Sequence, residues 1–161
     1  MGWEELKAGV IALSDEVALR LREEGMRCSV LQIMVRNPSM KTISRQCRMH
    51  TPTRLQKEIV DRAMELLHEN WQENAPVRAL SVTAQQLTPE DAAQAQLDLW
   101  PRTAALEKFE KAESAMQRMR LKYGRSCMAM GYVENEELGI AQFHKREKTL
   151  PAFVLDQTIG R

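Results

Sequence analysis

The 161 residues suit one domain with an appendage, or a domain and a half. With 43% hydrophobic and 28% charged residues the chain has a soluble, globular composition, and no apolar run approaches the roughly 20 residues of a membrane helix. The net charge of +1 hides an uneven distribution, because the stretch from Arg27 to Lys57 holds seven Lys or Arg and no Asp or Glu. A basic face on an otherwise acidic body favours a polyanionic partner, although a merely solvated pair of strands also accounts for it.

Cysteine and histidine positions give no sign of metal or disulfide chemistry. Cys28, Cys47 and Cys127 are odd in number and lack metal-ligand spacing, so we expect reduced thiols. The three histidines are scattered, and we predict no metal site. Nothing at the N-terminus reads as a signal peptide, so we expect a cytoplasmic protein without membrane contact.

The first predicted elements are a helix and a β-hairpin. Alternation from Leu31 to Val35 predicts a half-buried strand, the turn residues 37–39 follow, and residues 40–50 predict its antiparallel partner. Before them, a helix that Gly25 ends is predicted by an apolar stripe with spacings of three and four: Leu6, Val10, Leu13, Val17 and Leu21.

A second helix and a third strand complete this unit. Pro52 is expected in the first helical turn, and Thr53 and Gln56 stand at capping-box spacing. Residues 77–82 predict the third strand. The order helix–strand–strand–helix–strand predicts an α+β fold, an antiparallel sheet covered on one face by two helices. The apolar face of the second helix is predicted to hold Leu55, Ile59, Ala63, Leu66 and Trp71.

The remainder of the chain is more polar. Residues 83–96 predict a linker or a short helix begun at Thr88-Pro89, and residues 126–133 a short strand. The tail from Glu134 receives no assignment. Between them we expect a charged helical extension that Gly124 stops, with the apolar residues Leu106, Phe109, Met116 and Tyr123.

One strand is missing from the predicted sheet. A βαββαβ fold has a strand before its first helix, whereas here the helix begins almost at Met1, as in a cloned fragment. The sheet would then expose an unpaired edge, which invites self-association or pairing with a C-terminal strand.

Five consecutive segments resemble, in order and spacing, the little-finger domain of Y-family (DinB/UmuC-type) translesion DNA polymerases. The resemblance covers roughly residues 3–87, and residues 96–100 resemble the bacterial sliding-clamp-binding pentapeptide. The helix ending at residues 122–125 is similar, more weakly, to the family's C-terminal extension. The five segments are ELKAGVIALSDEVALRLREEG, VLQIMVRN, KTISRQ, TPTRLQKEIVDRAMELL and PVRALSV.

The resemblance implies a division of the chain and a role for it. Residues 3–87 would be the little-finger DNA-binding domain, 88–101 a linker with the clamp motif, and 102–161 a helical extension and tail. Nothing resembles the acidic palm segment that holds two metal ions for phosphoryl transfer. We therefore expect a non-catalytic fragment without a cofactor, from a Mg²⁺-dependent DNA polymerase of the SOS response and lesion bypass.

The family's sheet faces duplex DNA, which implies a set of DNA-binding residues. Hydroxyls beside guanidinium groups suit phosphate contacts, so sequence-independent binding is expected. Strand alternation sets Arg45 on the opposite face from Ser44 and Arg48, and we expect a bulge or a long-armed reach to bring it to DNA. Arg78 remains either a contact or a solvated charge. The candidates are Gln32, Arg36, Lys41, Thr42, Ser44, Arg45 and Arg48.

The clamp motif has two interpretations. Gln96 would set the register by hydrogen bonds, Leu97, Leu99 and Trp100 would fill an apolar pocket, and Asp98 would face solvent. Alternatively, the leucines and the tryptophan pack onto the domain's own core.

Two other functions stay open at this point. A stand-alone ferredoxin-like nucleic-acid-binding regulator would stack bases on sheet aromatics, which both strands of the hairpin lack. A dimeric adaptor would assemble through residues 102–123, whose apolar stripe is short and methionine-rich.

Overall fold

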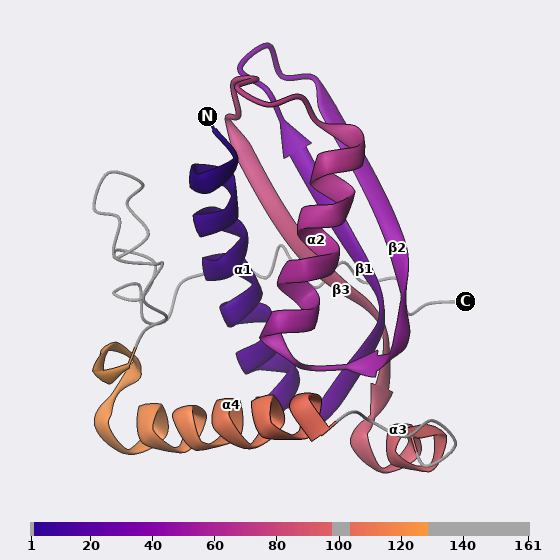
Figure 1. Cartoon of the computed structure of the whole chain (residues 1–161), viewed down its shortest axis with the longest axis vertical. Helices are drawn as coiled ribbons and strands as arrows, with labels where there is room; N and C mark the ends of the chain where they lie inside the picture. The colour runs from indigo at the N-terminus through magenta and orange to yellow at the C-terminus, as the bar shows by residue number, and fades with distance from the viewer. Residues whose placement is uncertain (1, 98–103, 129–161) are drawn as a thin grey trace.

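The computed structural model describes residues 2–97 and 104–128, with the side chains of all of these except 94–97 and 126. Its three strands form one antiparallel sheet, and α1 and α2 lie side by side over one face of that sheet (Figure 1). The expected α+β fold is therefore confirmed. In chain order the elements are α1 (Trp3–Glu23), β1 (Met26–Arg36), β2 (Thr42–Thr53), α2 (Gln56–Asn70), β3 (Ala79–Pro89), α3 (Glu90–Leu97), α4 (Ala104–Tyr123) and a 3₁₀ turn (Arg125–Cys127).

The hydrophobic core lies between the sheet and the two helices. Alternate residues of β1 point into it, and Gly25, in the left-handed region at φ +62°, lets the chain turn from α1 into β1. Burial of each large apolar side chain contributes roughly 1.5–3 kcal/mol. The largest apolar side chains that are fully buried are Leu6, Leu31, Ile33, Leu55, Ile59 and Leu67.

Strand β1 is the centre of the sheet, whose order is β2–β1–β3. It pairs with β2 from Arg36 opposite Thr42 down to Cys28 opposite Thr53, and with β3 along its whole length. A further strand can therefore join only outside β2 or β3. Those two edges, as far as the structure describes the chain, are also where the expected self-association would act.

The boundary between β2 and α2 differs from the prediction. Pro52 and Thr53 belong to β2, and the N-cap of α2 is Leu55, which has no side-chain cap. The Thr53 hydroxyl accepts a hydrogen bond from the Leu55 N–H at 3.1 Å, whereas the Gln56 side chain donates to the Ile11 carbonyl. The capping box is wrong because sheet pairing with Cys28 holds Thr53 in an extended conformation.

Strand β3 is longer than predicted and replaces half of the expected linker. It begins at Ala79 and runs to Pro89, where α3 follows directly. Its later residues read as a linker because only alternate positions face the helices, such as Val82 and Ala84, while Thr83 and Gln85 lie between them.

The predicted charged helix is present as α4, which crosses one end of the domain below α1 and α2 (Figure 1). Its packing differs from the prediction, since Phe109 and Tyr123 are exposed and its buried residues are Glu113 and Arg120. Gly124, at φ +94°, ends it. The described start of the predicted strand 126–133 is a 3₁₀ turn instead, and residues 129–133 lie outside the described residues.

Candidate nucleic-acid interface

The sheet face that α1 and α2 leave uncovered carries a polar surface, here called the open face. Residues that pair directly across antiparallel strands share a face, so Arg36 lies beside Thr42 and Gln32 beside Gln46. The Arg36 Nε donates to the Thr42 hydroxyl at 3.0 Å. The open face therefore presents hydroxyl, amide and guanidinium groups at fixed positions.

A line of amides and hydroxyls crosses all three strands on this face. The Gln32 side-chain nitrogen donates to the Ser44 hydroxyl of β2 at 2.5 Å, and Gln85 of β3 donates to the Gln32 oxygen at 2.5 Å. Because these contacts restrict the rotamers of the central glutamine, its polar groups are held in place before any ligand arrives.

Two of the candidate cations stand at different places on this surface. Arg48 pairs with Val30 and is exposed on the open face, near the middle of β2 and six residues along the strand from Thr42. Lys41 lies in the turn before β2, where its backbone N–H donates to the Asn37 side-chain oxygen at 2.9 Å. The structure thus brings six of the seven candidates to the open face or its adjoining turn: Gln32, Arg36, Lys41, Thr42, Ser44 and Arg48.

Arg45 is the exception. It pairs with Ile33 in an unbroken register, on the side of the sheet that the helices cover, and its Nε donates to the Asn70 side chain at 2.9 Å. The expected bulge at Arg45 is wrong. The irregularity in the β1–β2 pairing lies further along, between Cys28 and Val30.

The cations of the basic run from residue 27 to 57 do not all lie on the open face. Arg27 and Arg54 are not on the open face, because both contact Glu90 and Glu110, and Lys57 bonds Asp61 one turn along α2. Part of the charge excess is thus neutralised within the molecule, at Arg27 and Arg54 by acids that lie far away in sequence and at Lys57 by a neighbour on the same helix.

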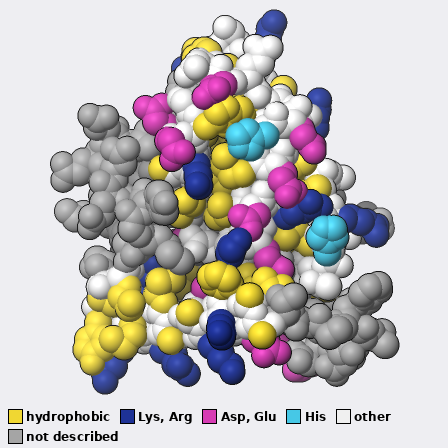
Figure 2. Space-filling view, viewed as in Figure 1, with side chains coloured by type: hydrophobic (Ala, Val, Ile, Leu, Met, Phe, Trp, Pro, Cys, Tyr) yellow, Lys and Arg dark blue, Asp and Glu magenta, His cyan; other side chains and the backbone are white. Residues whose placement is uncertain are grey.

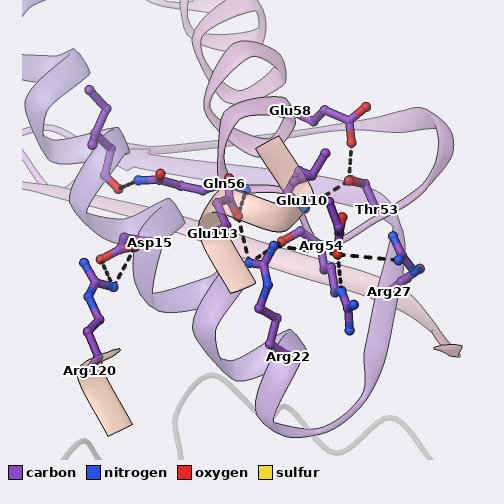
Figure 3. Close-up of polar contacts among 12 residues, drawn as sticks. Asp15, Arg22, Arg27, Thr53, Arg54, Gln56, Glu58, Glu110, Glu113 and Arg120 are labelled. Atoms are coloured by element: carbon purple, nitrogen blue, oxygen red, sulfur yellow. Dashed lines mark hydrogen bonds and ion pairs between the residues drawn. The ribbon is translucent and has the colours of Figure 1, made fainter. Parts of the chain in front are cut away.

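An arginine–glutamate cluster fastens α3 and α4 to one end of the domain, and Figure 3 shows its arginines around Glu110 and Glu113 of α4. Sequence reasoning missed it, although the unpaired basic run and two glutamates three residues apart on α4 were its signals. The cluster comprises Arg22 of α1, Arg27 of β1, Arg54 before α2, Glu90 of α3, and Glu110 and Glu113 of α4.

The contacts of Arg54, and that of Arg22 with Glu113, have the distances of charge-assisted hydrogen bonds, whereas Arg27 lies 3.6 Å from its two glutamates. Arg54 lies at the centre of the cluster, with its Nε 2.7 Å from Glu110 Oε1 and its Nη2 2.8 Å from Glu90 Oε1. Arg22 Nη1 is 2.7 Å from Glu113 Oε2, and a carboxylate oxygen of the same glutamate accepts from the Gln56 N–H at 3.1 Å. One arginine therefore holds a residue of α3 and a residue of α4 together.

The pKa values of the two α4 carboxylates in this cluster are shifted in opposite directions. Burial by itself raises the pKa of Glu110, but the hydrogen bond from Arg54 and the charges of Arg27, Arg54 and Arg22 outweigh it, so this pKa lies below its ordinary value. At Glu113 burial prevails over the charge of Arg22 and raises the pKa. Glu110 is therefore firmly ionised at neutral pH.

A second contact fixes the other end of α4. Arg120 Nη1 lies 2.9 Å from Asp15 Oδ2 of α1, and the Arg120 Nε donates to the Met128 carbonyl (Figure 3). Beyond the helix, Arg125 pairs with Glu16 at 3.2 Å. Among the residues described, α4 meets the domain chiefly through charged side chains.

The described residues contain no cluster of metal-ligating side chains. No group of three or more His, Cys, Asp or Glu side chains within them is arranged to hold a metal ion. Burial raises the pKa of the Cys28 thiol to about 12, which disfavours the reactive thiolate. A search of the same residues finds no helix long and apolar enough to cross a membrane.

The clamp motif lies only partly within the described structure. Gln96 and Leu97 are the last residues of α3, and Asp98, Leu99 and Trp100 lie outside the described residues. What the structure adds is the position of α3 and α4, the helices on either side of the motif.

Comparison with known proteins links this geometry to a family. A model of the impB/mucB/samB family C-terminal domain matches residues 2–99. DNA polymerase IV of Bacillus velezensis is 34% identical over 136 residues, which is 84% of this chain and 32% of that protein. DNA polymerase IV 1 of Bacillus subtilis is 30% identical over 134 residues, or 83% and 32%.

Other relatives show the same partial coverage. DNA polymerase IV of Clostridium kluyveri is 29% identical over 133 residues, which is 80% of this chain and 33% of that protein. The chain thus spans about a third of the length of the relatives it matches. Since the family model covers more than half of the chain, the chain belongs to the impB/mucB/samB family and carries its C-terminal domain, the little finger of Y-family DNA polymerases.

Proposed function

We propose that this chain is the DNA-binding and clamp-binding C-terminal part of a translesion DNA polymerase. Its relatives are named DNA polymerase IV, and two thirds of their length lies outside the match. We assign catalysis, and the Mg²⁺ it needs, to that other part. Residues 3–87 would hold DNA, 88–101 would carry the clamp motif and 102–161 would form the extension, during lesion bypass in the cytoplasm as part of the SOS response.

The open face is the observation that carries the DNA assignment. Arg36 and Arg48 stand six residues of β2 apart, roughly 20 Å along the strand, so they can contact separate phosphates. Between them, Ser44 and Gln32 supply neutral donors that need no rearrangement to bind a phosphate oxygen. Arg45 is left out of the proposed interface because it bonds Asn70 on the helix side.

Such an interface would suit a polymerase that crosses damaged template. Contacts to phosphate position the protein without reading bases, so a lesion leaves them unchanged. Each neutralised phosphate releases counterions, which makes the affinity steeply dependent on salt. We therefore expect binding that varies with ionic strength and little with DNA sequence.

Fluorescence anisotropy with a labelled primer–template tests this assignment. Replacement of Arg36 and Arg48 by Gln should lower the salt slope of log affinity by about 1.8, at about 0.9 per phosphate contact. The matched control is Lys7→Gln with Arg20→Gln, which removes the same charge from α1, on the other side of the sheet. Equal slopes for the two double variants would refute an interface on the open face.

For the clamp, we propose that Leu97, Leu99 and Trp100 fill a preformed apolar pocket, with Gln96 setting the register and Asp98 facing solvent. Binding of the chain to a bacterial sliding clamp should be micromolar, or about −8 kcal/mol, as expected for a short peptide contact. A Leu99→Ala/Trp100→Ala variant should lose it. Unchanged clamp binding by that variant would reject the motif, whatever the DNA result.

A further inference from the structure

A row of four cations lies along the outer side of α4. Lys108, Lys111, Arg118 and Lys122 follow each other at spacings of three, seven and four residues, and all four are exposed. At 3.6 residues per turn these spacings return to the same side of a helix. We call these four residues the α4 cationic row.

The contacts between α4 and the domain set the direction of this row. Glu113 and Arg120, the buried residues of α4, point toward Arg22 and Asp15 of α1 (Figure 3). They lie about half a turn around the helix from the cationic row. The row therefore faces away from the domain, and Figure 2 shows Lys and Arg side chains gathered along the lower edge of the molecule, beneath α4.

The same contacts leave the row with little compensating negative charge. Two of the three glutamates of α4, Glu110 and Glu113, are drawn into the arginine–glutamate cluster, so only Glu107 remains exposed. No ion pair joins Lys108, Lys111 or Arg118 to another side chain in the described parts of the chain, and the Lys122 ammonium lies 5.2 Å from the centroid of the Tyr123 ring. Docking thus draws two of the three acids of α4 away from the row.

We propose that the α4 cationic row is a second DNA-binding surface that contacts the phosphate backbone of duplex DNA. Its ends, Lys108 and Lys122, lie about 21 Å apart at 1.5 Å per residue. A duplex presents roughly 12 phosphate charges over such a length, at one per 1.7 Å. Four long cationic side chains on a rigid helix can therefore each meet a phosphate.

This surface is separate from the open face. Each belongs to a different element, α4 for the row and the β1–β2 pair for Arg36 and Arg48. The choice of DNA as the partner rests on the proposed function. With both surfaces engaged, the affinity and the salt slope would exceed what the open face alone supplies.

The test compares three double variants in the same primer–template titration, over a series of salt concentrations. Lys111→Gln/Arg118→Gln removes two charges from the row, and Arg36→Gln/Arg48→Gln removes two from the open face. The control, Lys7→Gln/Arg20→Gln, removes two charges from α1. All the substituted positions of the first variant are exposed on the helix, and circular dichroism verifies that each variant folds.

We expect the row variant to bind roughly ten-fold more weakly than the control and to lower the salt slope by about 1.8. The proposal is overturned if the row variant binds DNA like the control. If the row variant loses affinity while the open-face variant does not, the proposal stands and the open face fails. If only the open-face variant loses affinity for DNA, the open face is supported and the second surface on α4 is overturned.

Discussion

The Nε of Arg54 lies 2.7 Å from Oε1 of Glu110, a residue 56 positions further along the chain. The same guanidinium donates to Glu90, 36 positions away, at 2.8 Å. These two bonds bring the residue that precedes α2 into contact with both C-terminal helices. The attachment of α4 thus depends on charge pairing, and it follows that single charges decide its stability.

Removal of one charge of this pair should loosen α4. Glu110→Gln leaves Arg54 and Arg27 partly uncompensated, and we expect a cost of about 1–3 kcal/mol, less than for a fully buried pair because Glu110 keeps some exposure. Hydrogen exchange of the α4 backbone amides measures it. Glu65→Gln, which breaks a pair with Arg62 within α2, is the matched control and should change exchange little. Equal protection of α4 in both variants would contradict this attachment.

Acid should weaken the same attachment. The pKa of Glu110 is lowered below its ordinary value of 4.5, so its ionisation stabilises the folded state above that pH. This stabilisation is lost as the pH falls through the lowered pKa. Urea unfolding or α4 exchange measured between neutral pH and the acid range should show a smaller loss for Glu110→Gln than for the native chain. An identical pH profile would assign the acid sensitivity to other groups.

Arg45 and Arg48, three residues apart, should behave differently toward DNA. Arg48 is exposed on the open face, so Arg48→Gln should lower the salt slope of DNA binding by about 0.9, the contribution of one phosphate. Arg45→Gln should leave the slope unchanged and instead lose a hydrogen bond to Asn70, at a cost of about 1 kcal/mol in stability. A lower slope for Arg45→Gln would show that its side chain reaches DNA from the other face.

The three cysteines should react with a thiol reagent in a fixed order. Cys127 is exposed and should react first, whereas Cys28 is fully buried with its pKa raised to about 12 and should react only as the protein unfolds. Cys47 is half-buried, and burial raises its pKa although Arg62 opposes the shift, so it should react between them. All three should react together in concentrated urea, and early labelling of Cys28 would indicate a core more open than described.

Much of the fold could be predicted because it rests on local periodicity. Spacings of three and four placed α1, and alternation placed Ile33 and Val35 toward the helices and Gln32 away from them. The length of β3 could not be read in this way, because Thr83 and Gln85 face no core and look like linker residues. The prediction for Thr53 was wrong for a different reason. Its local sequence favours a helix cap, but its pairing with Cys28 keeps it in β2.

What the sequence determined by itself is the order of the elements from α1 to β3, the buried faces of α1, α2 and β1, and the family to which the segments belong. Only the tertiary structure decided which cations are available to a ligand. The sequence does not distinguish four arginines of the basic run, Arg27, Arg36, Arg48 and Arg54. In the structure, Arg27 and Arg54 form ion pairs with Glu90 and Glu110, whereas the other two lie on the open face. Periodicity is a property of neighbours along the chain, whereas an ion pair depends on which distant elements cross.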